Sequence, residues 1–160
     1  MDGDADDNNL LGPLMVSYMA QMESALKVSN IVSKHNNEEE LSADSVITGL
    51  IYRLMVPMED KEMEVSVNEA KKILGIEPSD EGLDSDSDSE LNYKEIETTE
   101  DYDKVIINRN IKRNNCNCDI CIKCRVCLSN YPNYEIHGDK LAQIFKDAID
   151  NACSIHNISI

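Results

Sequence analysis

Residues 11–35 read LGPLMVSYMAQMESALKVSNIVSKH. Apolar or small residues recur there in alternating steps of four and three, at Leu11, Met15, Tyr18, Met22, Ala25, Ser29 and Val32. Because an α-helix completes a turn every 3.6 residues, this spacing places them along one side of a helix. Pro13 fits the first turn, where its missing N–H leaves no hydrogen bond unmade. We therefore predict one long helix whose seam packs within a bundle or against a second copy of the chain.

Two further helices are predicted after this one. Ser42 has the side chain of an N-cap, and the apolar face that follows it ends before Pro57. The next predicted helix begins at a capping box formed by Ser66 and Glu69, and it stops at Gly75. The chain is therefore expected to be mainly α, with a small N-terminal helical bundle.

Charge divides the chain into segments. The formal net charge is -16, from 31 acidic and 15 basic residues. Residues 1–9 contain four Asp and no base, and residues 77–103 hold twelve acids and a single Lys. Such segments bury too little apolar surface to offset chain entropy. We predict an acidic disordered tail (1–9), a helical module (10–76), an acidic disordered linker (77–103) and a Cys-rich zinc module (104–160).

The linker contains candidate phosphorylation sites. Residues 84–90 read DSDSDSE, and Ser85, Ser87 and Thr98 each have an acid three residues further on. This pattern resembles the substrates of acidophilic kinases of the casein kinase 2 type. Each phosphate would add roughly 1.5 to 2 negative charges at neutral pH. The alternative is an unmodified acidic spacer.

A dense group of cysteines dominates the C-terminal segment. It consists of Cys116, Cys118, Cys121, Cys124 and Cys127, separated by one, two, two and two residues. The C-x2-C spacing lets two thiolates bind one tetrahedral ion while backbone N–H groups turn toward the sulfurs. A loop with so many thiols and so few apolar residues gains its order from the metal. The spacing predicts a soft-metal site, with zinc as the expected ion.

The last residues offer further ligands. Residues 139–152 have the pattern of an amphipathic helix that returns the chain to the cysteines. Our preferred arrangement places one zinc ion at Cys124, Cys127, Cys153 and His156. A second ion would take Cys116, Cys118 and Cys121, with His137 as a further candidate. The simpler alternative is a single zinc ion held by Cys118, Cys121, Cys124 and Cys127.

An iron–sulfur cluster is a minor alternative. The run from Cys118 to Cys127 resembles that of bacterial ferredoxins, which has three residues before its fourth Cys and a Pro after it. Here two residues precede Cys127, and Leu128 follows it.

The motifs of this chain favour binding over catalysis. A site dominated by Cys is closed and structural, whereas catalytic zinc keeps an open position. The sequence contains no Gly-rich phosphate loop and no G-x-S-x-G motif. We expect no catalytic residue and no small-molecule substrate.

The expected function is that of an adaptor or regulatory phosphoprotein, in which the helical module self-associates or binds one protein partner and the zinc module docks another. The layout is similar to that of small viral phosphoproteins such as the rotavirus viroplasm protein.

Nucleic-acid binding is the alternative function. Residues 104–127 contain six basic residues and one acidic residue, Asp119. The candidate contacts to phosphates are Arg109, Lys112, Arg113, Lys123 and Arg125. Zinc knuckles bind RNA or single strands through such cations, together with aromatic side chains that stack on bases.

Alternating apolar residues between Val105 and Ile111 predict a strand at this edge of the module.

The N-terminus and the cysteine usage indicate the compartment. The first nine residues are acidic and lack the basic start of a secretory signal. No apolar run approaches the roughly 18 residues that a membrane span requires. Cysteines crowded into one short run are more typical of reduced thiols than of disulfides. We therefore expect an intracellular protein of the cytoplasm or nucleus, with no membrane partner.

Overall fold

The computed structural model describes residues 7–76 and 107–160. The predictions for the acidic linker, including Ser85, Ser87 and Thr98, lie outside the described residues. The elements are α1 (Asp7–His35), α2 (Ala43–Met55), α3 (Asp60–Leu74), β1 (Arg109–Asn110), α4 (Asp119–Asn130), the 3-10 turn η1 (Tyr131–Asn133), α5 (Lys140–His156) and β2 (Ile158–Ser159). The predicted mainly α fold is confirmed.

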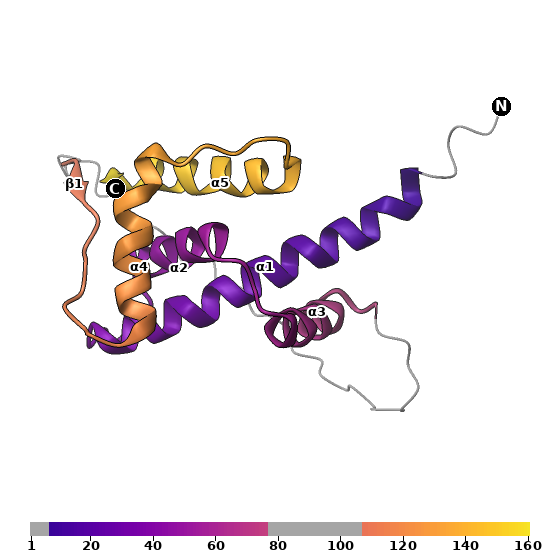
Figure 1. Ribbon diagram of the computed structural model, residues 1–160, viewed down its shortest axis with the longest axis horizontal. Helices are drawn as coiled ribbons and strands as arrows, with labels where there is room; N and C mark the ends of the chain where they lie inside the picture. Colours follow the sequence, from indigo (N-terminus) through magenta and orange to yellow (C-terminus); the bar gives the residue numbers. More distant parts are fainter. Residues whose placement is uncertain (1–6, 77–106) are drawn as a thin grey trace, which may run out of the picture.

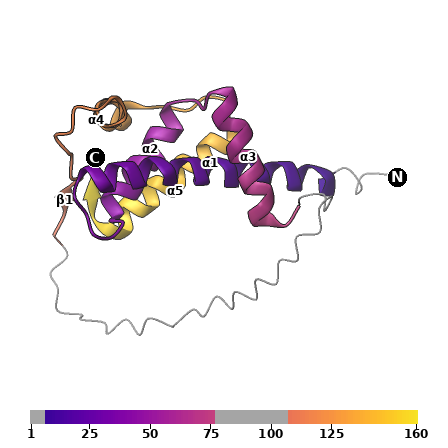
Figure 2. The same cartoon turned by 90° about the horizontal axis from the view of Figure 1, so that it is seen from below.

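Helix α1 is the longest element, and it begins at Asp7 rather than at the predicted Leu11. Pro13 therefore lies inside the helix instead of in its first turn. The C-terminal half of the predicted seam is buried, including Ala25 and Val32. The N-terminal end of α1 extends past the other helices (Figures 1 and 2), and Leu11 there keeps 58% of its surface exposed.

Helix α2 begins where the N-cap pattern predicts. The backbone N–H of Ser45 donates to Ser42 Oγ at 3.2 Å. Gly49 lies where α2 meets α1, and a Cβ atom at this position would approach Ser29 Oγ to 2.0 Å and the Ala25 carbonyl oxygen to 2.5 Å. The two helices are therefore as close as they are because residue 49 has no side chain.

The predicted start of α3 at Ser66 is wrong. The helix begins at Asp60, and the Glu62 carboxylate accepts a hydrogen bond from the backbone N–H of Glu59 at 3.1 Å. Ser66 lies in the middle of the helix and is buried. Two capping patterns compete here, and the helix begins at the earlier one, at Glu59 and Glu62. The residues that this earlier start adds, 60–65, are exposed. The predicted end is confirmed, since Gly75 adopts a left-handed conformation with φ 68°.

The C-terminal residues form two helices and a small strand pair. Helix α4 covers most of the cysteine run, although the density of thiols there predicts a loop. Helix α5 begins after Asp139, whose carboxylate accepts a hydrogen bond from the Ala142 N–H at 3.0 Å, and it extends past the predicted Ala152 to His156. Strands β1 and β2 pair in parallel. The predicted strand is thus only two residues long in the part that the structure describes.

One hydrophobic core joins the helices on both sides of the undescribed segment. It includes Val28 and Val32 of α1, Ile47 and Ile51 of α2, Leu128 of α4, and Phe145 and Ile149 of α5. Helix α2 lies between α1 and the C-terminal helices and contacts them all (Figure 1). The end of α1 and the start of α4 are thereby held next to each other. Among the described helices, none is long and apolar enough to cross a membrane.

Candidate metal centre

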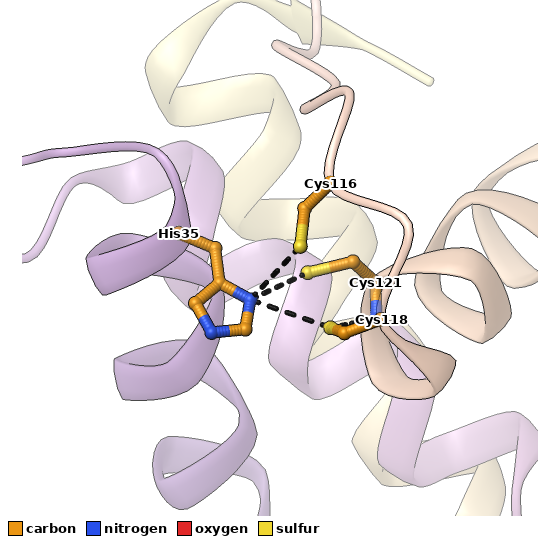
Figure 3. A group of neighbouring side chains, drawn as sticks. All are labelled: His35, Cys116, Cys118 and Cys121. Atoms are coloured by element: carbon orange, nitrogen blue, oxygen red, sulfur yellow. Dashed lines mark hydrogen bonds between the residues drawn. The ribbon is translucent and has the colours of Figure 1, made fainter.

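Four side chains converge at the junction of α1 and α4 (Figure 3). They belong to His35, Cys116, Cys118 and Cys121, and their ligand atoms all lie within 4.8 Å of one another. The Nδ1 atom of His35 is 3.2 Å from Cys121 Sγ and 3.3 Å from the sulfurs of both Cys116 and Cys118. This group could hold a metal ion.

Local structure places each of the four side chains. His35 is the last residue of α1, Cys118 is the N-cap of α4, and Cys121 lies in the first turn of that helix. Cys116 belongs to the preceding loop, which Arg125 of α4 holds by donating from Nη1 to the carbonyl oxygen of Cys116 at 2.6 Å. The end of one helix, the start of another and one loop therefore meet at this site.

Two of the thiols accept hydrogen bonds at sulfur. The backbone N–H of Cys121 donates to Cys118 Sγ at 3.4 Å, and Asn114 Nδ2 donates to Cys121 Sγ at 3.1 Å. The first bond is the largest of several effects that lower the pKa of Cys118 to about 7, and a lowered pKa favours the thiolate that binds metal. Burial raises the pKa of Cys121 to about 11, so a cation is needed to keep this buried sulfur ionised.

The geometry fits a tetrahedral ion better than a set of hydrogen bonds. A single ring nitrogen either donates one hydrogen or offers one lone pair, so it cannot satisfy three sulfurs at once. Around a zinc ion, bond lengths near 2.3 Å for sulfur and 2.0–2.1 Å for nitrogen place these atoms about 3.6 Å apart. The observed separations of 3.2 and 3.3 Å are a few tenths of an ångström shorter.

The other two cysteines of the run point into the protein. Cys124 and Cys127 are buried within the hydrophobic core, and Cys153 packs against the same core. Burial raises the pKa of Cys124 to about 12, which keeps this thiol neutral. His156 is exposed at the end of α5. The structure thus does not bring Cys124, Cys127, Cys153 and His156 together as our preferred arrangement required.

Helix formation also separates the cysteines of the simpler arrangement. With a rise of 1.5 Å per residue, Cys118 and Cys127 are about 13 Å apart along α4. One tetrahedral ion cannot bind both ends of such a row. The C-x2-C spacing therefore brings two thiols together only at Cys118 and Cys121. Cys124 and Cys127 lie on the side of the helix that faces the core.

The third histidine also lies apart from the group. His137 is 83% exposed, and its Nε2 atom is 3.6 Å from the Glu135 carboxylate.

The sequence pattern does not identify His35 as a candidate ligand, because His35 is separated from Cys121 by 86 positions in the chain. One signal could have indicated it, since a Cys116–Cys118–Cys121 set lacks a fourth ligand and the chain has only three histidines.

An ion pair fixes the segment that leads to Cys116. Arg109 donates to both carboxylate oxygens of Asp44 at 2.7 and 2.5 Å, and the backbone N–H of Lys112 donates to the same carboxylate at 2.7 Å. The hydrogen bonds from Arg109 hold the pKa of Asp44 below its usual value. Because Asp44 is buried at the start of α2, it anchors this segment to the helical core.

The predicted phosphate-binding cations are partly engaged within the protein. Arg109 pairs with Asp44, Arg125 binds loop carbonyl oxygens, and Arg113 donates to Ser129 Oγ at 2.9 Å. The side chains of Lys112 and Lys123 are exposed.

Comparison of the chain with protein-family models, curated proteins and solved structures found no match.

Proposed function

We propose that His35, Cys116, Cys118 and Cys121 bind one structural zinc ion in a non-enzymatic adaptor or regulatory protein. The observation that supports this is the convergence of three thiol sulfurs on one imidazole nitrogen. Three thiolates and one imidazole are a common ligand set for structural zinc. Soft sulfur ligands also disfavour magnesium and calcium, which prefer oxygen.

Four protein ligands complete the coordination of zinc, so no position remains for water or substrate. This is the reason for assigning the ion a structural role. It would join the last residue of α1 to the first turn of α4, and it would therefore stabilise the packing of residues 107–160 on the N-terminal helices. An iron–sulfur cluster remains the minor alternative, because thiolates also bind iron.

Exposed apolar side chains support the adaptor role. Leu11, Leu14 and Met15 lie on the projecting end of α1, and Met63 and Ile73 are exposed on α3. Clustered apolar residues at a surface are typical of protein interaction sites. We assign these helices to partner binding or self-association. Residues 84–90 with their candidate phosphosites would tune such contacts, in the cytoplasm or nucleus of the cell.

The nucleic-acid alternative has weaker support. Three of the five candidate cations already donate hydrogen bonds to groups of the protein itself. These hydrogen bonds use part of the donor capacity of each guanidinium and hold it against the protein, which leaves fewer donors for a phosphate.

Native mass spectrometry of the full chain, purified under reducing conditions, tests the metal assignment. We expect the mass of one zinc ion per chain in the wild type and in the His137→Gln and His156→Gln variants. His35→Gln should lose most of the zinc at limiting metal concentration. Two zinc ions, iron with sulfide, or full zinc retention by His35→Gln would contradict the assigned ligand set.

A further inference from the structure

A cavity of about 410 Å³ lies between α1, α2 and α3, with one residue of α4 at its end. Its wall includes apolar side chains from three helices, namely Val28, Ile31, Val65 and Ile120. None of the four metal-binding side chains belongs to this wall. Cavities of this size and character are typical of small-molecule sites.

The wall also contains a buried arginine with few partners. The side chain of Arg53 is only 3% exposed. Its Nη1 donates to the Val56 carbonyl oxygen at 3.3 Å, while its Nε is buried without a hydrogen-bond partner. A guanidinium group has five N–H donors, and burying its charge is unfavourable unless they are paired.

The nearest carboxylate compensates this charge poorly. Glu62 Oε1 lies 3.7 Å from Arg53 Nη2, which is beyond hydrogen-bond distance. Glu62 is also 52% exposed, and its other oxygen accepts from the Glu59 N–H at the start of α3. A better partner for the Arg53 guanidinium would be an anion within the cavity.

The surrounding charge favours an anion as well. Lys27 and Lys61 belong to the wall, together with Arg53 and Glu62. Lys27 is paired with Glu23 at 3.0 Å, so Arg53 and Lys61 against Glu62 leave the wall with one net positive charge. This local excess stands out in a chain of net charge -16, and it lies beside a wall that is largely apolar.

We propose that this cavity binds a small monocarboxylate with an apolar body. The carboxylate pairs with Arg53, displacing the exposed side chain of Glu62, and the apolar body packs against Val28, Val65 and Ile120. Such a molecule is a ligand that the protein holds and does not convert, because the wall offers no nucleophile paired with a base. The proposal is independent of the zinc assignment.

Titration of the full-length, ¹⁵N-labelled protein with octanoate tests this proposal by NMR. We expect saturable shifts of the backbone amides of Val28, Tyr52 and Val65. Octylammonium, which has the same chain length and the opposite charge, should give no saturable shift. The proposal is overturned if octanoate gives no saturable shift, or if 1-octanol binds as tightly as octanoate.

Variants locate the carboxylate. Glu62→Gln removes the competing anion while it keeps a side chain that can cap α3, so octanoate affinity should rise several-fold. Lys61→Gln removes an exposed cation and should weaken binding about twofold. Arg53→Met should weaken it about tenfold or more if the variant folds. Lys72→Gln, on α3 but outside the wall, is the matched control and should bind as the wild type does. Unchanged affinity in both Glu62→Gln and Lys61→Gln would refute the assigned position.

Discussion

The Nδ1 atom of His35 lies 3.2 Å from the sulfur of Cys121, although 86 positions separate the two residues. A metal ion bound between them would close a large loop of the chain. It would act as a cross-link between the end of α1 and the start of α4. Its removal should therefore lower the stability of the whole helical core and not of the site alone.

Removal of the metal should lower stability. Zinc that binds only the folded chain contributes about 4 kcal/mol when its free concentration is a thousand times its dissociation constant. We expect a chelator to lower the free energy of unfolding of the wild type by several kcal/mol and to have little effect on His35→Gln. Urea unfolding with and without chelator measures both. An equal chelator effect on the two proteins would show that His35 is not a ligand.

Cys121 and Cys124 should respond differently to substitution. Cys121→Ser should lose zinc, because a hydroxyl group is a much poorer zinc ligand than a thiolate. Cys124→Ala should keep one zinc ion per chain and lose about 1–2 kcal/mol of stability, because it leaves a small void in the core. Cobalt titration followed by the thiolate–metal absorption distinguishes the two variants. Loss of tetrahedral cobalt binding in Cys124→Ala would mean that the core cysteine also binds metal.

The ion pair between Asp44 and Arg109 should make stability depend on acid. The pKa of Asp44 is lowered in the folded protein. The pair's contribution to the free energy of unfolding is therefore fully present above the unfolded-state pKa of about 3.9, and it is lost as the pH falls through the folded-state pKa. At pH 7, Asp44→Asn should cost about 1.5–3 kcal/mol. Urea unfolding in the presence of chelator should show the difference from wild type shrinking below about pH 4. A difference that stayed constant down to pH 2 would argue against the pair.

Gly49 should tolerate no side chain. A Cβ atom there would lie 2.0 Å from Ser29 Oγ, so Gly49→Ala forces α1 and α2 apart and should cost about 1–3 kcal/mol or more. Gly12→Ala is the matched control, because nothing lies within 4 Å of its Cβ position. Thermal unfolding of both variants tests this. Equal stability of the two would show that the helices separate here without cost.

Local sequence was sufficient to predict several helix ends. The N-cap at Ser42 and the start of α5 after Asp139 each depend on one side chain that accepts a hydrogen bond from a nearby backbone N–H. The stop at Gly75 depends on the absence of a side chain, which permits the left-handed conformation. Local rules failed at Ser66, where a valid capping pattern lies inside a longer helix. The helix starts instead at an earlier capping box, formed by Glu59 and Glu62.

The sequence by itself determined that the protein is mainly helical and that the region around Cys116 and Cys121 has the chemistry of a metal site. Both properties follow from the periodicity of side chains and the spacing of thiols, which act within a few residues. Only the tertiary structure decided that His35 is the partner of these cysteines, and that Cys124 faces the core. One reason is that the helical rise spreads the cysteine run along α4. The other is that α2 packs against both α1 and α4, which brings the distant His35 to the first turn of α4.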